Sequence, residues 1–217
     1  MIAAKEPTAP VMAVRTAVIL FFFVVAFTAA LAVVYFATKP GIDAAAAEEK
    51  MRAINEVLPK ELYDNDLLAD TLKLPVTPEL GLDDESLVYR GRRAGEPSAL
   101  VLETVAPDGY SGKIRMLVAV KANGELAGVR VTQHKETPGL GDYIEPKKDK
   151  NKSRPWVTQF DGLSLDKAPS PEWKVKKDGG RFDSVAGATV TPRAVVKAVH
   201  KALKYAGENR DRLFASN

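Results

Sequence analysis

Cysteine is absent from this 217-residue chain, and histidine occurs only twice, as His134 and His200. Without cysteine, the protein cannot form disulfides, cysteine-ligated iron–sulfur clusters or a catalytic thiol. Neither histidine has a partner at the spacing of a metal site or a catalytic triad, so we expect no metal and no catalytic side chain. Any redox function would therefore require a bound organic cofactor.

Common nucleotide-binding and hydrolase motifs are also missing. The sequence has no GxGxxG, no Walker loop, no GxSxG and no HExxH. Its net charge of +3 is too small to indicate a nucleic-acid partner, which usually requires a strongly basic face. A content of 46% hydrophobic and 27% charged residues is normal for a folded domain with a sizeable core.

The longest apolar segment, residues 16–37, contains no charged side chain. A transmembrane helix needs about 20 such residues. A cleaved signal peptide is the alternative, but its apolar region is usually about 7–15 residues long, and the cleavage site here would be a poor one. The segment is therefore predicted to be a retained membrane anchor. The charged residues that flank it leave its orientation open.

Beyond the anchor, the sequence predicts helices at both ends of a β-rich region. Residues 43–62 have helical spacing of apolar residues, with Asp43 as a plausible N-cap. Strands are expected at 99–105, 114–120 and 126–133, with Asn123-Gly124 as a hairpin turn. A last helix is expected from about residue 191 to 210, with Pro192 in its first turn. These elements predict an α+β fold, an antiparallel sheet with flanking helices, preceded by one N-terminal transmembrane helix. The expected divisions are a tail (1–15), the transmembrane helix (16–38), a helical linker and loop (39–85) and the main domain (86–217).

Two short segments are rich in glycine and other small residues, so side chains cover little of their backbone. "ETPGLGD", residues 136–142, is either a turn before a helix or a loop whose N–H groups approach a flat or anionic ligand. "AGATVTP", residues 186–192, allows the same two interpretations. In the first, Thr191 is the N-cap of the last helix. In the second, Thr189 lies ahead of the helix N-terminus, where the dipole favours an anion by about 0.3–1 kcal/mol.

The amino-acid sequences of these segments resemble those of a known family. "DSVAGATVTP" is similar to the flavinylation motif of the FMN-binding domain family, in which an aspartate precedes (Ser/Thr)-Gly-Ala-(Thr/Ser). Together with "HKETPGLGDYIE", "WKVKKDGGRFD" and "GATVTPRAVVKAVHKAL", it resembles the G subunits of the Rnf (Rsx) ion-translocating electron transport complexes. The C subunit of the sodium-pumping NADH:quinone reductase shares the flavin motif.

The resemblance implies a redox component of a translocase rather than a stand-alone enzyme. It would carry FMN in a complex that couples ferredoxin–NAD electron transfer to ion transport, anchored by one span in the bacterial inner membrane with its C-terminal domain outside the cytoplasm. Its partners would be the other membrane subunits and, during maturation, a magnesium-dependent flavin transferase that uses FAD and recognises Asp183. FMN would be attached to Thr189 by a phosphoester. The other expected cofactor-binding residues are Gly187, Ala188, Thr191, Glu136, Thr137, Gly139, Leu140 and Gly141.

One position departs from the motif. Residue 186 is alanine, where the family usually has serine or threonine. This residue is not the flavin acceptor, but its change leaves open a structural or assembly protein with an empty flavin fold. A second alternative is an FMN-dependent reductase that acts alone on a small substrate. A yellow chromophore in the purified protein would exclude the first, and turnover by the isolated domain would favour the second.

Overall fold

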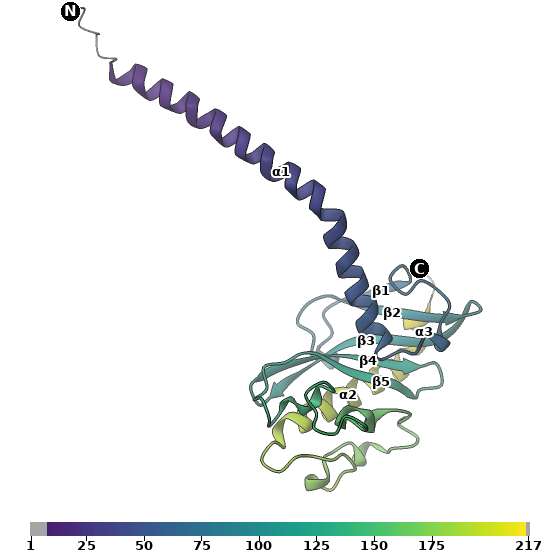
Figure 1. The fold of residues 1–217 in the computed structure, drawn as a ribbon. Helices are drawn as coiled ribbons and strands as arrows, with labels where there is room; N and C mark the ends of the chain where they lie inside the picture. Colours follow the sequence, from purple (N-terminus) through teal and green to yellow (C-terminus); the bar gives the residue numbers. More distant parts are fainter. Residues whose placement is uncertain (1–7, 216–217) are drawn as a thin grey trace, which may run out of the picture. The chain divides into compact units, whose positions relative to one another are not determined.

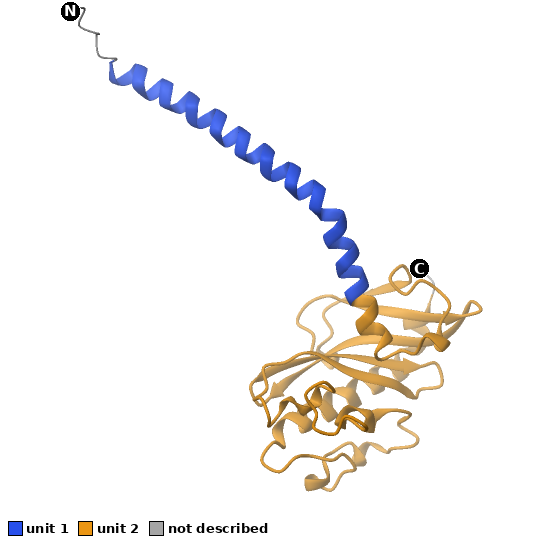
Figure 2. Cartoon of the chain, viewed as in Figure 1, with its two compact units in different colours: residues 1–49 blue, residues 50–217 orange. Residues whose placement is uncertain are grey.

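The computed structural model describes residues 8–215 of the chain (Figure 1). The chain divides into two compact units, residues 1–49 and residues 50–217 (Figure 2).

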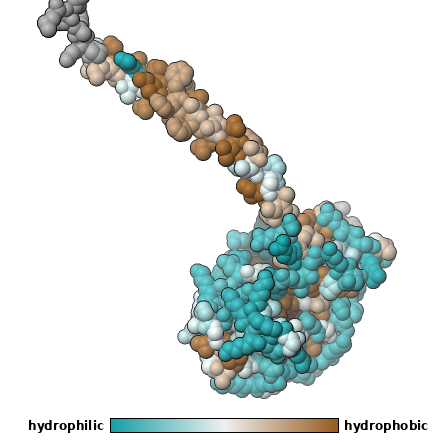
Figure 3. Space-filling view, viewed as in Figure 1, coloured by the Kyte–Doolittle hydropathy of each residue, from teal (hydrophilic) through white to brown (hydrophobic). Residues whose placement is uncertain are grey.

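The described part of the first unit consists of most of one long helix, α1 (Ala9–Asn55), whose residues 50–55 belong to the second unit. The helix contains the predicted apolar segment and is long and apolar enough to cross a membrane. Figure 3 shows apolar side chains covering α1, whereas the visible face of the second unit is mainly hydrophilic.

A separate helix starting at Asp43 was predicted, and this prediction is wrong. Asp43 lies inside α1 and pairs with Lys39 one turn earlier, at 3.1 Å. The helix continues through Pro40. Proline lacks one N–H donor, but the alanine-rich sequence that follows favours helix strongly enough to continue it.

The second unit is built on a five-stranded antiparallel sheet in the order β1-β2-β3-β4-β5. The strands are β1 (Thr71–Leu74), β2 (Ser86–Arg93), β3 (Glu96–Gly109), β4 (Gly112–Lys121) and β5 (Leu126–Gln133). This arrangement confirms the predicted α+β class and the three predicted strands. Strands β1 and β2 were not predicted, and β1 lies within the stretch expected to be linker and loop.

Both faces of the sheet are buried. On one face lies α2 (Val190–Glu208), which buries Val195, Val199 and Leu203 against residues such as Leu102 and Val118. The opposite face packs against the end of α1 and the residues after it, including Ile54, Val57 and Leu58. Neighbouring residues of β3 alternate between the two clusters, as expected of a strand buried on both sides.

The remaining elements are short. The C-terminal helix α3 (Arg210–Phe214) follows α2 directly. Residues 134–189 between β5 and α2 are mostly irregular, with one isolated β-bridge between Val175 and Phe182. Short 3₁₀ helices occur at Lys60–Leu62, Pro78–Leu80, Asp142–Ile144, Trp156–Phe160, Ser170–Glu172 and Lys176–Asp178.

Candidate functional site

A cleft of about 220 Å³ opens where three segments of the second unit meet. They are the β3–β4 turn, the ETPGLG loop (residues 136–141) and the AGATVT segment (residues 186–191). These two predicted ligand-binding stretches are about fifty residues apart in sequence, and the fold brings them to the same cleft. The lining residues are Tyr110, Glu136, Thr137, Leu140, Gly141, Gly187, Ala188, Val190 and Thr191.

Hydrogen bonds donated by its own backbone N–H groups hold the ETPGLG loop in a tight conformation. The N–H groups of Leu140 and Gly141 both donate to the carbonyl of Thr137 at 3.1 Å. The N–H of Gly139 donates to the Asp142 carboxylate at 2.8 Å. These bonds form a tight turn, which leaves the Leu140 side chain half exposed at the mouth of the cleft.

Glu136 connects the loop to the other two segments. Its side chain is buried, and Oε1 accepts a hydrogen bond from the Ser111 N–H in the β3–β4 turn at 3.0 Å. Oε2 accepts a hydrogen bond from the Thr191 hydroxyl in the first turn of α2. Gly141 is required beside this pair, because a Cβ atom there would lie 2.7 Å from Thr191 Oγ1.

The start of α2 differs from the sequence prediction. The helix begins at Val190, and Thr189 occupies the N-cap position, with no capping hydrogen bond from its side chain. Thr191 was predicted as the N-cap, which is wrong: it lies inside the helix, is 2% exposed and points to Glu136. A buried carboxylate is a stronger acceptor than a neutral group. It therefore outweighs the bias of a residue before proline against helical angles.

The AGATVT segment enters the helix through a tight turn. The N–H of Ala188 donates to the carbonyl of Val185 at 3.0 Å, and Gly187 has φ of +83°. Ala186 is exposed, and Thr189 is half-buried. Of the predicted cofactor-binding residues, Gly139 and Thr189 do not line the cleft; each lies next to a residue that does.

Comparison with known proteins assigns this architecture to a family. The model for the RnfG N-terminal region matches residues 11–57, and that for the FMN-binding domain matches residues 109–204. The G subunit of an ion-translocating oxidoreductase complex from Pseudomonas aeruginosa is 49% identical over 201 residues, covering 93% of this chain and 92% of the relative. The chain belongs to the RnfG family. The corresponding G subunit from Shewanella loihica is 41% identical and covers 92% of both chains.

A solved structure also matches, at lower similarity. The C subunit of the Na(+)-translocating NADH-quinone reductase from Parabacteroides distasonis is 19% identical, covers 71% of this chain and 73% of that chain, and has a TM-score of 0.37. The RnfG relatives support an electron-transfer protein with an FMN-binding domain.

In this member of the RnfG family, apolar side chains surround the cleft. Tyr110, Leu140 and Val190 are 70%, 49% and 42% exposed, respectively, although large apolar side chains in the second unit are mostly buried. All three line the cleft. A flat apolar ring placed there would remove their surfaces from water, which is favourable.

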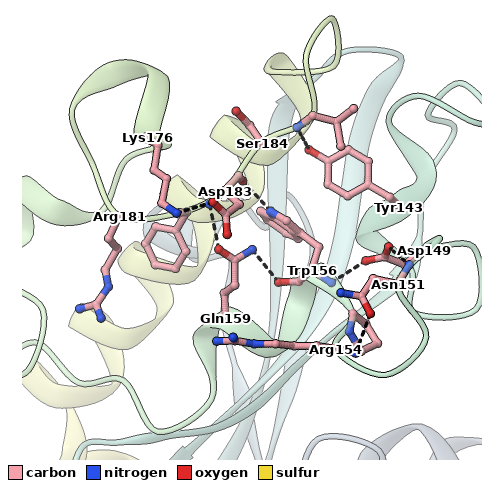
Figure 4. A pocket seen from close by; sticks show the side chains of 13 residues that line it. Tyr143, Asp149, Asn151, Arg154, Trp156, Gln159, Lys176, Arg181, Asp183 and Ser184 are labelled. Atoms are coloured by element: carbon pink, nitrogen blue, oxygen red, sulfur yellow. Dashed lines mark hydrogen bonds and ion pairs between the residues drawn. The ribbon is translucent and has the colours of Figure 1, made fainter.

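A second and larger cavity, of about 550 Å³, adjoins residues 183–185, just before the AGATVT segment (Figure 4). Trp156 Nε1–H donates to the Asp183 carbonyl at 2.6 Å, and the Asp183 N–H donates to Gln159 Oε1 at 2.8 Å. The Asp183 carboxylate itself is exposed and pairs with Lys176 at 2.5 Å. The backbone of Asp183 is therefore fixed, while its carboxylate remains accessible.

Tyr143 lies between this cavity and the turn of the AGATVT segment. Its hydroxyl accepts from the Val185 N–H at 3.4 Å and contacts the Ala188 carbonyl at 3.5 Å. Burial raises the pKa of Tyr143 to about 12, so the phenol stays neutral at physiological pH.

The side chains of Tyr110, Tyr143, Trp156 and Gln159 were not predicted as site residues. No local signal marks them, because each reaches the site only through the packing of the irregular segment and the β3–β4 turn. The loop of residues 147–154 is exposed apart from one buried side chain, Asp149, whose carboxylate accepts a hydrogen bond from the Trp156 N–H at 2.6 Å.

The two histidines have structural contacts. His134 Nδ1 accepts from the Glu136 N–H at 3.1 Å, and its Nε2 lies 3.4 Å from Glu145. His200 stacks on Trp173, with ring centroids 5.1 Å apart. Within residues 8–215, no three histidine or carboxylate side chains are grouped so as to hold a metal ion.

Proposed function

We propose that this protein carries FMN covalently on Thr189 and relays electrons within an ion-translocating membrane complex. The observation that carries the proposal is the meeting of the ETPGLG loop and the AGATVT segment at one cleft, beside the N-terminus of α2. Two glycine-containing segments whose backbone a ligand can approach meet in one small domain, and one shared ligand explains this best.

Thr189 is suited to carry a phosphoester. Its hydroxyl makes no capping hydrogen bond, so esterification disrupts no bond that the helix start needs. The phosphate would lie beside the free N–H groups of a 19-residue helix. The dipole of such a helix stabilises an anion at its N-terminus by about 0.3–1 kcal/mol.

The cleft fits the ring system of FMN. Leu140, Val190 and Tyr110 offer apolar surface for the isoalloxazine, and Gly141 allows close approach of the backbone. The flavin supplies reversible electron transfer, which none of these side chains provides, while the protein binds and orients it. Covalent attachment suits a relay, because the carrier cannot diffuse away between transfers.

Maturation would require a flavin transferase. In that reaction the Thr189 oxygen would form a bond to the FMN phosphorus of FAD, the threonine proton would pass to a base of the transferase, and AMP would leave. The magnesium ion would belong to the transferase. Asp183 is the proposed recognition residue, since its carboxylate is exposed beside the larger cavity, six residues before Thr189.

The proposed membrane position rests on α1. We propose that its apolar part spans the bacterial inner membrane once, with the C-terminal domain outside the cytoplasm and the other membrane subunits of the complex as partners. Support comes from the length and composition of the helix and from the family.

An assembly protein with an empty flavin fold is the less favoured function. That alternative depends on Ala186, whose side chain is exposed and does not line the cleft. Its missing hydroxyl therefore removes no contact from the ligand site.

The test is flavin fluorescence of the full-length protein on a denaturing gel, after co-expression with a flavin transferase. Wild type should fluoresce and Thr189→Val should not. Thr191→Val is the matched control, because it removes a threonine hydroxyl two residues away, and it should retain some covalent flavin. Fluorescence of Thr189→Val equal to wild type would refute Thr189 as the acceptor, and a dark wild type would support the empty scaffold.

A further inference from the structure

We infer that the buried carboxylate of Glu136 positions the flavin attachment segment and lowers the reduction potential of the flavin. The inference rests on the proposed function. Glu136 would not be a catalytic residue; its effect would pass through Thr191 and through its charge.

The carboxylate is enclosed from several sides. Glu136 is 4% exposed and receives the Ser111 N–H and the Thr191 O–H, one on each oxygen. A Cβ atom on Gly109 would lie 2.9 Å from Oε1, and one on Gly141 would lie 2.9 Å from Oε2. Glycine at both positions therefore lets the main chain close over the carboxylate.

This enclosure connects Glu136 to the acceptor threonine. Thr191 is in the first turn of α2, two residues after Thr189, and its hydroxyl points to Glu136 rather than to the helix backbone. The hydrogen bond fixes that first turn against a loop 55 residues away in sequence. The direction in which Thr189 presents its oxygen thus depends on Glu136.

The charge of Glu136 is not neutralised by a cation. The two partners of its side chain are neutral donors. Between residues 8 and 215 no lysine, arginine or histidine forms an ion pair with its carboxylate; the neighbouring His134 ring accepts the Glu136 backbone N–H and pairs with Glu145 instead. Accepting on both oxygens is the pattern of an ionised carboxylate. A negative charge in the wall of the cleft repels an electron added to a flavin bound there, and burial strengthens that repulsion.

The experiment uses the full-length protein, co-expressed with the transferase and purified in detergent. Three quantities are measured: the rate at which covalent flavin accumulates per chain, the midpoint potential by spectroelectrochemical titration, and the melting temperature. Glu136→Gln is compared with Glu145→Gln, which also removes a carboxylate from this region. Glu145 makes a suitable control because it pairs with Lys148 at 3.0 Å and does not line the cleft.

We expect Glu136→Gln to shift the flavin potential to more positive values than in wild type or Glu145→Gln. Flavin attachment should be about tenfold slower, the factor that corresponds to one hydrogen bond to a charged group. Thr191→Val should show the same slower attachment, and Thr191→Ser, which keeps the hydroxyl, should restore it.

Each outcome has one meaning. An unchanged potential in flavin-loaded Glu136→Gln, or a shift equal to that of Glu145→Gln, contradicts the charge effect. Failure of Thr191→Ser to restore attachment contradicts the positioning role, as does flavin loss that accompanies a collapse of the melting temperature. Complete flavin loss in a Glu136→Gln protein that melts like wild type supports positioning. A wild type without covalent flavin refutes the proposed function itself, which is a separate result.

Discussion

At the scale of single residues, the conformation of the AGATVT segment depends on one glycine. Gly187 has φ of +83° in the turn that leads to Thr189. A side chain in this left-handed region costs about 1–2 kcal/mol. Its neighbour Ala186 is exposed and has no such constraint in its backbone.

We therefore predict that Gly187→Ala lowers the free energy of unfolding by about 1 kcal/mol and reduces covalent flavin, because the turn relaxes away from its present shape. Ala186→Ser, which introduces the hydroxyl usual in the family, should leave both unchanged. Denaturant unfolding and flavin fluorescence of the two full-length variants provide the measurement. Equal flavin content in Gly187→Ala and wild type would contradict this dependence on the turn.

At the scale of elements, charged side chains hold the end of α3 against the sheet. Asp70, next to β1, accepts from Arg90 Nε at 2.6 Å and from Arg92 Nε at 2.7 Å. Both arginines lie on β2 and also donate to carbonyls at the end of α3, from Arg90 to Ala215 and from Arg92 to Phe214. Burial alone would raise the pKa of Asp70, but the hydrogen bonds and charges of Arg92 and Arg90 hold it below its ordinary value.

A lowered pKa in the folded state means that Asp70 contributes stability above its unfolded pKa, near 3.9, and that this contribution is lost as the pH falls through the folded value. Asp70→Asn should therefore lower the free energy of unfolding by about 2 kcal/mol at pH 7, between the values for exposed and fully buried pairs. The difference from wild type should shrink as the pH falls below about 4. Urea unfolding at several pH values measures this.

The control for Asp70→Asn is Asp83→Asn. Asp83 also pairs with a basic side chain, Lys113, but the pair is exposed, so its loss should change stability little. A difference between Asp70→Asn and wild type that stays constant down to pH 2 would contradict the assignment of this contribution to ionised Asp70.

The same cluster explains why β2 could not be predicted from its sequence. The strand reads SLVYRGRR, and three arginines in eight residues do not indicate a buried strand. Arg90 can be buried because Asp70 and the carbonyls of Ala215 and Thr71 accept hydrogen bonds from its guanidinium group. The strands β3, β4 and β5 were predictable, because their own apolar residues and the Asn123-Gly124 turn indicate them.

The candidate site, like the sheet, was only partly predictable from the sequence. The similarity of short segments to a family motif, together with the known chemistry of helix N-termini, was sufficient to select the ETPGLG loop and the AGATVT segment. The role of Thr191 was mistaken, because its true partner, Glu136, lies 55 residues earlier and only the fold brings the two together. The backbone bias of a residue before proline suggested that Thr191 is the N-cap. Its hydrogen bond to Glu136 instead stabilises it inside the helix.

At the scale of the whole molecule, the proposed function requires that α1 be retained as an anchor and that the FMN-binding domain lie outside the cytoplasm. Large apolar side chains such as Phe22, Leu31 and Phe36 are exposed along α1, as expected of a helix whose surroundings are lipid. The charges near its ends do not determine the direction of insertion.

We predict that a reporter active only in the cytoplasm stays silent when fused after Asn217, whereas one active only outside the cytoplasm gives a signal. Both fusions should remain in the membrane fraction after alkaline washing, which controls for loss of the anchor. Cytoplasmic activity of the first fusion in a membrane-bound protein would contradict the proposed topology.

The most direct test of the central claim is peptide mass spectrometry of the full-length protein from cells that contain the flavin transferase. We predict one peptide that carries the mass of an FMN phosphoester, with fragment ions that locate it on Thr189. An adduct on Thr191 or Ser184 would contradict the assignment. Unmodified peptide alone would contradict the flavin relay and leave the empty scaffold as the function.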